Sequence, residues 1–130
     1  PVLRPKAAAE LVQARARLLQ GCGGDLTPLQ QAATHDRLES DCQKALLSLA
    51  AAYLLQLSPT ATGDPVARFH LDNGARLERI NARGNMAPPG LKQSFGLMVN
   101  YLYDLEQVEA NHEKFKQGEV ARSRAVQALI

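Results

Sequence analysis

The helix predicted to end at about Leu57 constrains the fold more than any other part of the chain. Helix restarts at Asp36 or Ser40, and apolar residues then fall on nearly every side of it: Leu46, Leu47, Leu49, Ala50, Tyr53, Leu54 and Leu57. A helix that is apolar on most sides has to pack on two sides, against a sheet or between layers. The first fifty residues offer too little partner surface. We therefore expect a sheet further along the chain to cover the second side.

Helical spacing also dominates the start of the chain. Lys6 to Leu19 is rich in alanine and leucine and predicts a helix, which the glycines among residues 21–24 end. Thr27 followed by Pro28 is typical of an N-cap and a first helical residue. We expect a short helix from there to about His35.

After a loop at residues 58–65 the period changes to that of strands. Val66 to Asp72 and Ala75 to Asn81 predict two strands, and Asn73-Gly74 between them predicts a type I′ hairpin turn. Leu97 to Tyr103 predicts a third strand. In the first strand, alternation would place His70 on the polar face, away from the neighbouring apolar side chains.

The remaining segments predict helix. Leu91 to Phe95 fits one helical turn, and Asp104 to Phe115 and Glu119 to Leu129 fit two helices separated by Gly118. This order gives an α+β fold in which helices flank a small, mainly antiparallel sheet. We divide the chain into a helical segment, residues 1–57, and a sheet-containing part, residues 58–130. Since three strands make a poor sheet alone, we expect the latter to be the C-terminal portion of a larger domain.

Composition excludes several classes of protein. The 130 residues carry a formal net charge of +2, which is far from a nucleic-acid footprint. No apolar run is long enough to cross a bilayer, and Pro1 to Pro5 is no signal peptide. The two cysteines, Cys22 and Cys42, predict free thiols in a reducing compartment, the cytoplasm. Because the chain does not begin with Met, we expect it to start inside a longer protein or to be processed.

His70 is the clearest candidate for chemistry. A neutral imidazole near pH 7 suits general acid or base work, although spacing alone favours a half-exposed strand histidine without a role. We expect His35 and His112 to be solvated, since both lie among charged residues of helices. No two histidines have a metal-ligand spacing with a carboxylate or thiol, so we expect no metal site.

A second cluster lies on the third predicted strand. Asn100, Tyr101 and Tyr103 supply an amide and two phenols, which can hold a carbonyl or an oxyanion. Core packing with a hydrogen-bonded tip is the alternative, and it is favoured for at least one tyrosine. The chain has no GxSxG, phosphate-binding loop or dinucleotide-binding fingerprint.

At these residues the sequence resembles the malonyl-CoA decarboxylase family, in its C-terminal region. The resemblance covers roughly Lys44 to Ile130, whereas residues 1–40 resemble the family only weakly. Several ordered blocks match with the right separations, and the bacterial form is the most similar. The blocks are DPVARFHL (64–71), NGA (73–75), LERIN (77–81), GLMVNYLYDL (96–105), EANHE (109–113), GEVA (118–121) and SRAV (123–126).

The resemblance implies an acetyltransferase-like (GNAT) catalytic domain, preceded by a helical domain that supports homo-oligomers. It implies conversion of malonyl-CoA to acetyl-CoA and carbon dioxide, without a metal or organic cofactor and without nucleic-acid or membrane partners. His70 then corresponds to the histidine of a catalytic serine–histidine pair, and Tyr103 to a tyrosine that lines the site. We expect Asn81 and Asn100 to bind substrate. The serine and the CoA-binding loop belong to the upstream part of the same protein.

One loop departs from the family pattern. The family usually has Trp, an aliphatic residue and Asp after the Ile-Asn pair, followed by Ser or Thr, whereas here the run is ARGNMA (82–87). This leaves an alternative hypothesis: a truncated or diverged relative that binds acyl-CoA or a partner subunit without catalysis. A generic acyltransferase would need an acyl-acceptor site, which the sequence does not show.

Overall fold

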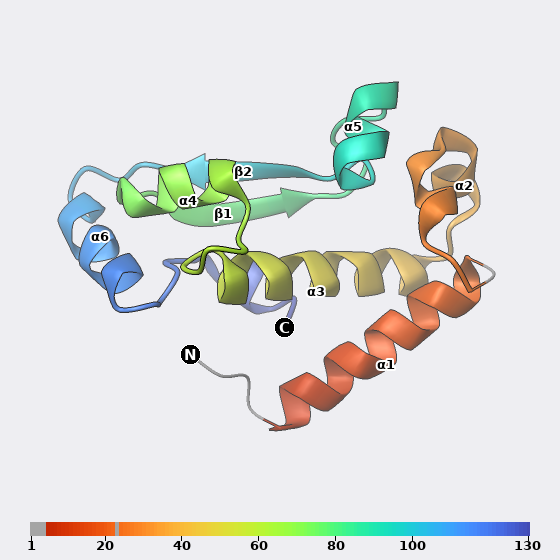
Figure 1. Ribbon diagram of the computed structural model, residues 1–130, viewed down its shortest axis with the longest axis horizontal. Helices are drawn as coiled ribbons and strands as arrows, with labels where there is room; N and C mark the ends of the chain where they lie inside the picture. Colours follow the sequence, from red (N-terminus) through yellow and green to blue (C-terminus); the bar gives the residue numbers. More distant parts are fainter. Residues whose placement is uncertain (1–4, 23) are drawn as a thin grey trace.

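The computed structural model describes residues 5–22 and 24–130 (Figure 1). The expectation about Pro1 to Pro5 therefore lies largely outside the described residues. The elements of the structure in chain order are α1 (Pro5–Gly21), η1 (Thr27–Gln30), α2 (Ala32–Arg37), α3 (Ser40–Leu57), α4 (Pro65–Asp72), β1 (Arg76–Asn81), α5 (Pro88–Ser94), β2 (Met98–Leu102), α6 (Val108–Lys116) and α7 (Arg124–Gln127). The α+β class is confirmed, with a small antiparallel sheet in which β1 pairs with β2.

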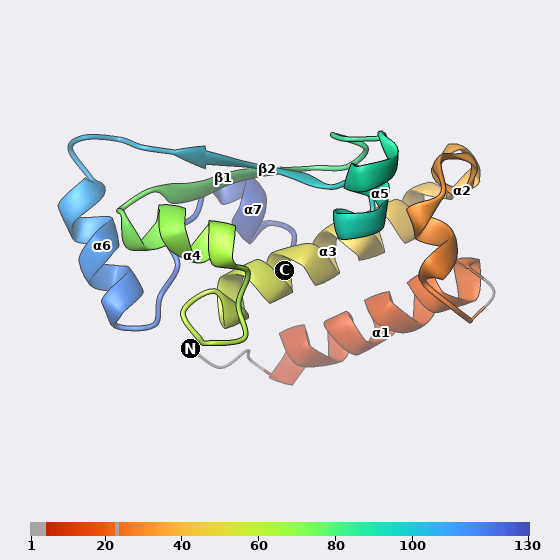
Figure 2. The same cartoon turned by 45° about the horizontal axis from the view of Figure 1, so that its top comes forward.

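Helix α3 is the layer that joins the two halves of the described chain. It lies between the sheet and α1 in both views (Figures 1 and 2). Its first half, with Cys42 and Leu46, packs in a core with Leu18 of α1. Its second half, with Leu54, packs in another core with Leu77 of β1. The predicted two-sided packing of this helix is therefore confirmed.

The two strands carry one face that packs on the core and one exposed face. Leu77 pairs with Tyr101 and Ile80 with Val99, and these pairs contribute to the core that includes Leu54. Asn100 lies between Val99 and Tyr101 in β2, so alternation turns its side chain to the opposite face. The predicted strands from Ala75 and from Leu97 are confirmed within a residue or two.

The predicted strand Val66 to Asp72 is wrong, because this segment is helix α4. The Asp64 carboxylate accepts a hydrogen bond from the Ala67 amide at 2.9 Å, and Pro65 occupies the first turn. This is an N-cap followed by a proline whose missing N–H costs the helix nothing. Ala67 and Leu71, four residues apart, form the buried face of the helix. His70 therefore lies on the flank of a helix, and the strand alternation assumed for it does not apply.

The hairpin expected at Asn73-Gly74 is also wrong. These two residues end α4: the Gly74 amide donates to the Leu71 carbonyl at 3.1 Å, and the Ala75 amide donates to the His70 carbonyl at 3.1 Å. The pair of bonds is a Schellman motif, in which Gly74 adopts φ +93°. Asn-Gly supplies left-handed backbone equally well to a hairpin and to a helix end. Here the helix uses it.

The C-terminal segment departs from the expected helices in two places. The helix predicted from Asp104 begins at Val108, and the helix predicted from Glu119 begins only at Arg124. Residues 121–123 instead run beside β1, where the Leu77 amide donates to the Ala121 carbonyl at 2.8 Å and the Ser123 amide donates to the Leu77 carbonyl at 3.0 Å. Ser123 then caps the short α7 through its side chain.

Two smaller expectations near η1 are wrong. Thr27 is the first residue of η1 and not its N-cap, because Asp25 accepts hydrogen bonds from both its amide and its hydroxyl. His35 is not solvated: its side chain is buried, with 7% of the residue exposed, and its Nε2 lies 2.7 Å from the Leu29 carbonyl oxygen. That hydrogen bond satisfies a polar ring inside the helical half.

Helix α6 is packed directly on the end of α4. A Cβ at Gly74 would lie 2.4 Å from the Val108 carbonyl oxygen, and the buried Asn111 side chain donates to the Gly74 carbonyl at 3.1 Å. Gly118 ends α6 with the same motif at φ +88°, but a Cβ there would meet nothing within 4 Å.

We predict that Gly74→Ala lowers the free energy of unfolding by about 2 kcal/mol or more. Left-handed backbone costs an L-residue roughly 1–2 kcal/mol, and the contact with the α6 backbone adds to that cost. Gly118→Ala is the matched control, and we expect it to cost about 1 kcal/mol from the backbone term alone. Denaturant titration of the two variants would measure this. Equal losses would contradict the packing of α6 on the α4 cap.

Candidate functional site

His70 lies in the last turn of α4, where the Schellman motif holds its carbonyl. Two tyrosines from β2 and the residue after it reach the imidazole: the Tyr101 ring stacks on it, and the Tyr103 hydroxyl binds it. Phe69, its neighbour on the helix, meets the imidazole edge-on with ring centroids 5.3 Å apart. The last turn of α4 and the end of β2 thus build an aromatic site around one half-buried histidine.

The contact between His70 and Tyr103 fixes one ring nitrogen. Nδ1 lies 2.7 Å from the Tyr103 hydroxyl oxygen, within hydrogen-bond distance. If the phenol donates, Nε2 carries the ring proton, and if it accepts, Nε2 carries a free lone pair. Among the described residues none hydrogen-bonds Nε2. The arrangement therefore leaves one nitrogen of an oriented imidazole available to give or take a proton.

The Tyr101 ring stacks on one face of the His70 imidazole. Its centroid lies 4.5 Å from that of His70, with an angle of 23° between the planes. Burial, followed by the charge of Asp64 and then by Tyr103, raises the pKa of the Tyr101 phenol to about 12. Tyr101 is therefore a neutral ring at physiological pH. Of the two functions considered for the tyrosines, core packing describes Tyr101, although no described residue hydrogen-bonds its hydroxyl. The Tyr103 hydroxyl binds His70, and its binding of a carbonyl or an oxyanion stays a prediction.

Asn81 and Asn100 form a separate pair. The Asn81 side-chain amide donates to the Asn100 side-chain oxygen at 2.5 Å and more weakly to the Met98 carbonyl at 3.3 Å. Because Asn100 points to the face of the sheet opposite Tyr101, the structure does not bring this pair together with His70. Their substrate-binding role stays a prediction.

Helix α6 supports the site from behind the α4 cap. The His112 ring nitrogen Nδ1 contacts the Asp72 carbonyl oxygen and lies 3.4 Å from the Asp72 carboxylate. The Asn111 side chain binds the Gly74 carbonyl in the same region. Helix α6 therefore holds the carbonyls of both Asp72 and Gly74, on either side of Asn73. The expectation that His112 is merely solvated missed this contact. The sequence holds no local signal for it, because Asp72 and His112 are forty residues apart.

A mainly apolar cavity of about 470 Å³ adjoins the site. It lies between α3, the apolar face of the sheet and the segment around α5, and Tyr101, Tyr53 and Phe95 are among the residues that line it. The Tyr101 side chain therefore contacts His70 and also lines this cavity. Tyr53, which is 42% exposed, borders the cavity from α3.

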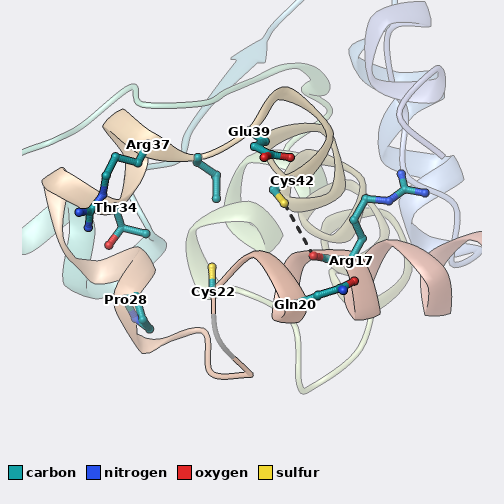
Figure 3. Close-up of a pocket in the computed structure, with 9 residues that line it drawn as sticks. Arg17, Gln20, Cys22, Pro28, Thr34, Arg37, Glu39 and Cys42 are labelled. Atoms are coloured by element: carbon teal, nitrogen blue, oxygen red, sulfur yellow. Dashed lines mark hydrogen bonds between the residues drawn. The ribbon is translucent and has the colours of Figure 1, made fainter.

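A second hollow, of about 630 Å³, lies in the helical half between α1, α2 and α3 (Figure 3). Both cysteines line it as free thiols, and the Cys42 thiol donates to the Arg17 carbonyl at 3.7 Å. Burial, Cys42 and Asp25, in that order, raise the pKa of the Cys22 thiol. A raised pKa disfavours the reactive thiolate of Cys22. The Cys42 side chain is buried against α1. None of the predicted site residues lines this hollow.

Neither a metal centre nor a membrane span is found in the described ranges. Residues 5–22 and 24–130 contain no group of three or more His, Cys, Asp or Glu side chains that could hold a metal ion. Within the same ranges, no helix is both long and apolar enough to cross a bilayer.

Comparison with known proteins points to one family. The family model described as "Malonyl-CoA decarboxylase C-terminal domain" matches residues 3–130. The crystal structure of malonyl-CoA decarboxylase from Rhodopseudomonas palustris is 52% identical, covers 76% of this chain and superposes with a TM-score of 0.64. The corresponding structure from Cupriavidus metallidurans is 33% identical, covers 91% of this chain and superposes with a TM-score of 0.73.

A curated protein sequence points to the same family. "Malonyl-CoA decarboxylase, mitochondrial" from Rattus norvegicus is 41% identical over 80 residues, or 61% of this chain. The matched region is a minor part of each relative: 16% of the rat protein, 22% of the R. palustris chain and 31% of the C. metallidurans chain. This chain thus spans less than a third of the length of the proteins it matches.

We predict that the Tyr101 phenol ionises with a midpoint near pH 12. Absorbance at 295 nm during alkaline titration, taken as the difference between the unmodified protein and Tyr101→Phe, isolates this group. Because the folded pKa exceeds the ordinary value of about 10, its contribution to stability is complete below pH 10 and is lost as the pH rises toward 12. A difference midpoint near 10 in the folded protein would contradict the burial of this ring.

Proposed function

Because the chain belongs to the malonyl-CoA decarboxylase family, we propose that it is the C-terminal segment of such an enzyme, with His70 and Tyr103 forming one wall of the active site. The enzyme would convert malonyl-CoA to acetyl-CoA and carbon dioxide. The observation that carries this proposal is the 2.7 Å contact between Nδ1 of His70 and the hydroxyl of Tyr103. It joins, from two distant segments, the two residues to which the family resemblance assigns the site.

The reaction requires a group of this kind. When the malonyl carboxylate leaves as carbon dioxide, its electron pair passes to the thioester as an enolate. The site has to stabilise that oxyanion and then deliver a proton to the methylene carbon. An imidazole with Nε2 available can supply the proton or polarise a partner hydroxyl, while Tyr103 keeps the ring oriented through Nδ1.

The other wall would come from the upstream part of the same protein. This chain covers less than a third of the matched structures, and the resemblance places the catalytic serine and the CoA-binding loop upstream. We likewise propose that β1 and β2 belong to a larger acetyltransferase-like sheet. A two-stranded sheet is marginal alone, which is consistent with this view. Asn81 and Asn100 would then contact the substrate only if a neighbouring segment extends the site around the sheet.

The non-catalytic relative is the second candidate. The loop of residues 82–87 lacks the aromatic and acidic residues usual in the family, and this favours binding without turnover. Its test is binding of acetyl-CoA, measured by calorimetry on the longest protein that contains this chain. Binding with no release of carbon dioxide from malonyl-CoA would favour this candidate over the first.

We predict that His70→Gln lowers kcat for carbon dioxide release by about a hundredfold or more, the usual scale for a general acid or base. Tyr103→Phe should lower kcat by about tenfold, because the imidazole loses one hydrogen-bond partner and keeps its position. Both are measured in the longer protein with malonyl-CoA. Tyr53→Phe, on the exposed side of α3, is the control and should stay within about twofold. Unchanged turnover in His70→Gln would rule out the proposed role.

We also propose that the reaction needs no metal. Exhaustive treatment of the longer protein with EDTA, followed by gel filtration, should leave kcat within about twofold of the untreated value, since the proposed chemistry uses only side chains. Loss of turnover that returns on addition of a divalent cation would overturn this part of the proposal.

A further inference from the structure

We propose that Tyr101 is a positioning residue that holds the His70 imidazole in the plane where Nδ1 meets Tyr103 and Nε2 is left available. Its effect on turnover rests on the function proposed above, whereas its effect on the imidazole does not. The sequence placed Tyr101 in a cluster with Asn100 and Tyr103 that could hold a carbonyl or an oxyanion, but it did not predict a contact between Tyr101 and His70.

Among the aromatic neighbours of His70, Tyr101 lies most nearly parallel to the imidazole. The planes of the two rings differ by 23°, with centroids 4.5 Å apart. Phe69 and Tyr103 meet the imidazole at 80° and 67°, at 5.3 and 5.8 Å. A stacked ring resists tilting of its partner, because tilting breaks van der Waals contact across a whole face. Edge contacts leave the tilt free.

Tyr101 is itself fixed, as a positioning residue has to be. Its backbone is paired with Leu77 in the sheet, and its ring packs against the core beneath β1. Phe69 cannot serve in the same way, because it is the helix neighbour of His70 and is 63% exposed. The stack thus ties the end of α4 to the sheet.

The ring of Tyr101 carries this role, and its hydroxyl does not. No residue in the described ranges hydrogen-bonds the Tyr101 hydroxyl, whereas the Tyr103 hydroxyl binds Nδ1. Phenylalanine at position 101 would keep the stack, and leucine would keep only apolar volume. The two substitutions therefore separate positioning from hydrogen bonding and from core packing.

The kinetic test uses the longer protein with malonyl-CoA. Tyr101→Leu should lower kcat about tenfold to a hundredfold while KM changes less than about threefold, on the scale expected for a misplaced catalytic group. Tyr101→Phe should keep kcat within about twofold of the unmodified protein, because phenylalanine preserves the stacked ring. Tyr53→Leu, which removes another tyrosine that lines the same cavity but does not touch His70, should leave kcat nearly unchanged.

A spectroscopic test follows the imidazole directly. With histidine labelled at Cε1, the His70 signal is assigned by its loss in His70→Gln. The neighbouring stacked ring should shift it upfield in the unmodified protein and in Tyr101→Phe, and the shift should vanish in Tyr101→Leu. This readout is independent of turnover, so it decides the positioning claim even if the unmodified protein releases no carbon dioxide.

Three outcomes would overturn the inference. The first is equal impairment of Tyr101→Phe and Tyr101→Leu, which would assign the role to the hydroxyl. The second is a His70 signal that does not respond to Tyr101→Leu. The third is a loss of kcat in Tyr53→Leu as large as that in Tyr101→Leu, which would reduce the effect to general packing of the cavity wall.

Discussion

The cap at the end of α4 is the contact on which the site depends. Gly74 in a left-handed conformation lets its own amide and that of Ala75 close on the last turn of the helix, and one of the two bonds ends on the His70 carbonyl. The same glycine has no Cβ, which leaves room for the backbone of α6. Asn111 then binds the Gly74 carbonyl. The backbone of the histidine is therefore held by the fold before any side chain acts.

The sheet supplies the second constraint, through its two-residue period. Residues 101 and 103 share the parity that faces α4, so one strand end delivers a stacked ring and a hydrogen-bonding phenol to the same imidazole. The same period turns Asn100 to the other face. Two sets of polar groups that look like one cluster in the sequence are thus two clusters in space, and only one of them contains the histidine.

Sequence reasoning proposed His70 and Tyr103 for one site, and the structure places the two in contact, but the predicted secondary structure of the histidine was wrong. The strand prediction depended on Asn73-Gly74, but this pair fits a hairpin turn and a helix end equally well, because both need positive φ. Asp64-Pro65 held the missing information: it is the same cap-and-proline signal that predicted a helix at Thr27-Pro28. The α3 helix and both strands of the sheet were predictable from their periodicity. The contacts of His35 and His112 were not predictable. The His35 partner, the Leu29 carbonyl, is only six residues away but is brought near by the turn between η1 and α2. The His112 partner is forty residues away and is brought near by the tertiary fold.

In the proposed site, His70 and Tyr103 act as one unit. A double-mutant cycle on kcat in the longer protein, with His70→Gln, Tyr103→Phe and both together, tests this most directly. If Tyr103 acts through His70, the double variant should be no slower than His70→Gln alone, because the phenol has nothing left to orient. If the two losses multiply, the residues act independently, and the account of a tyrosine-held catalytic imidazole is wrong.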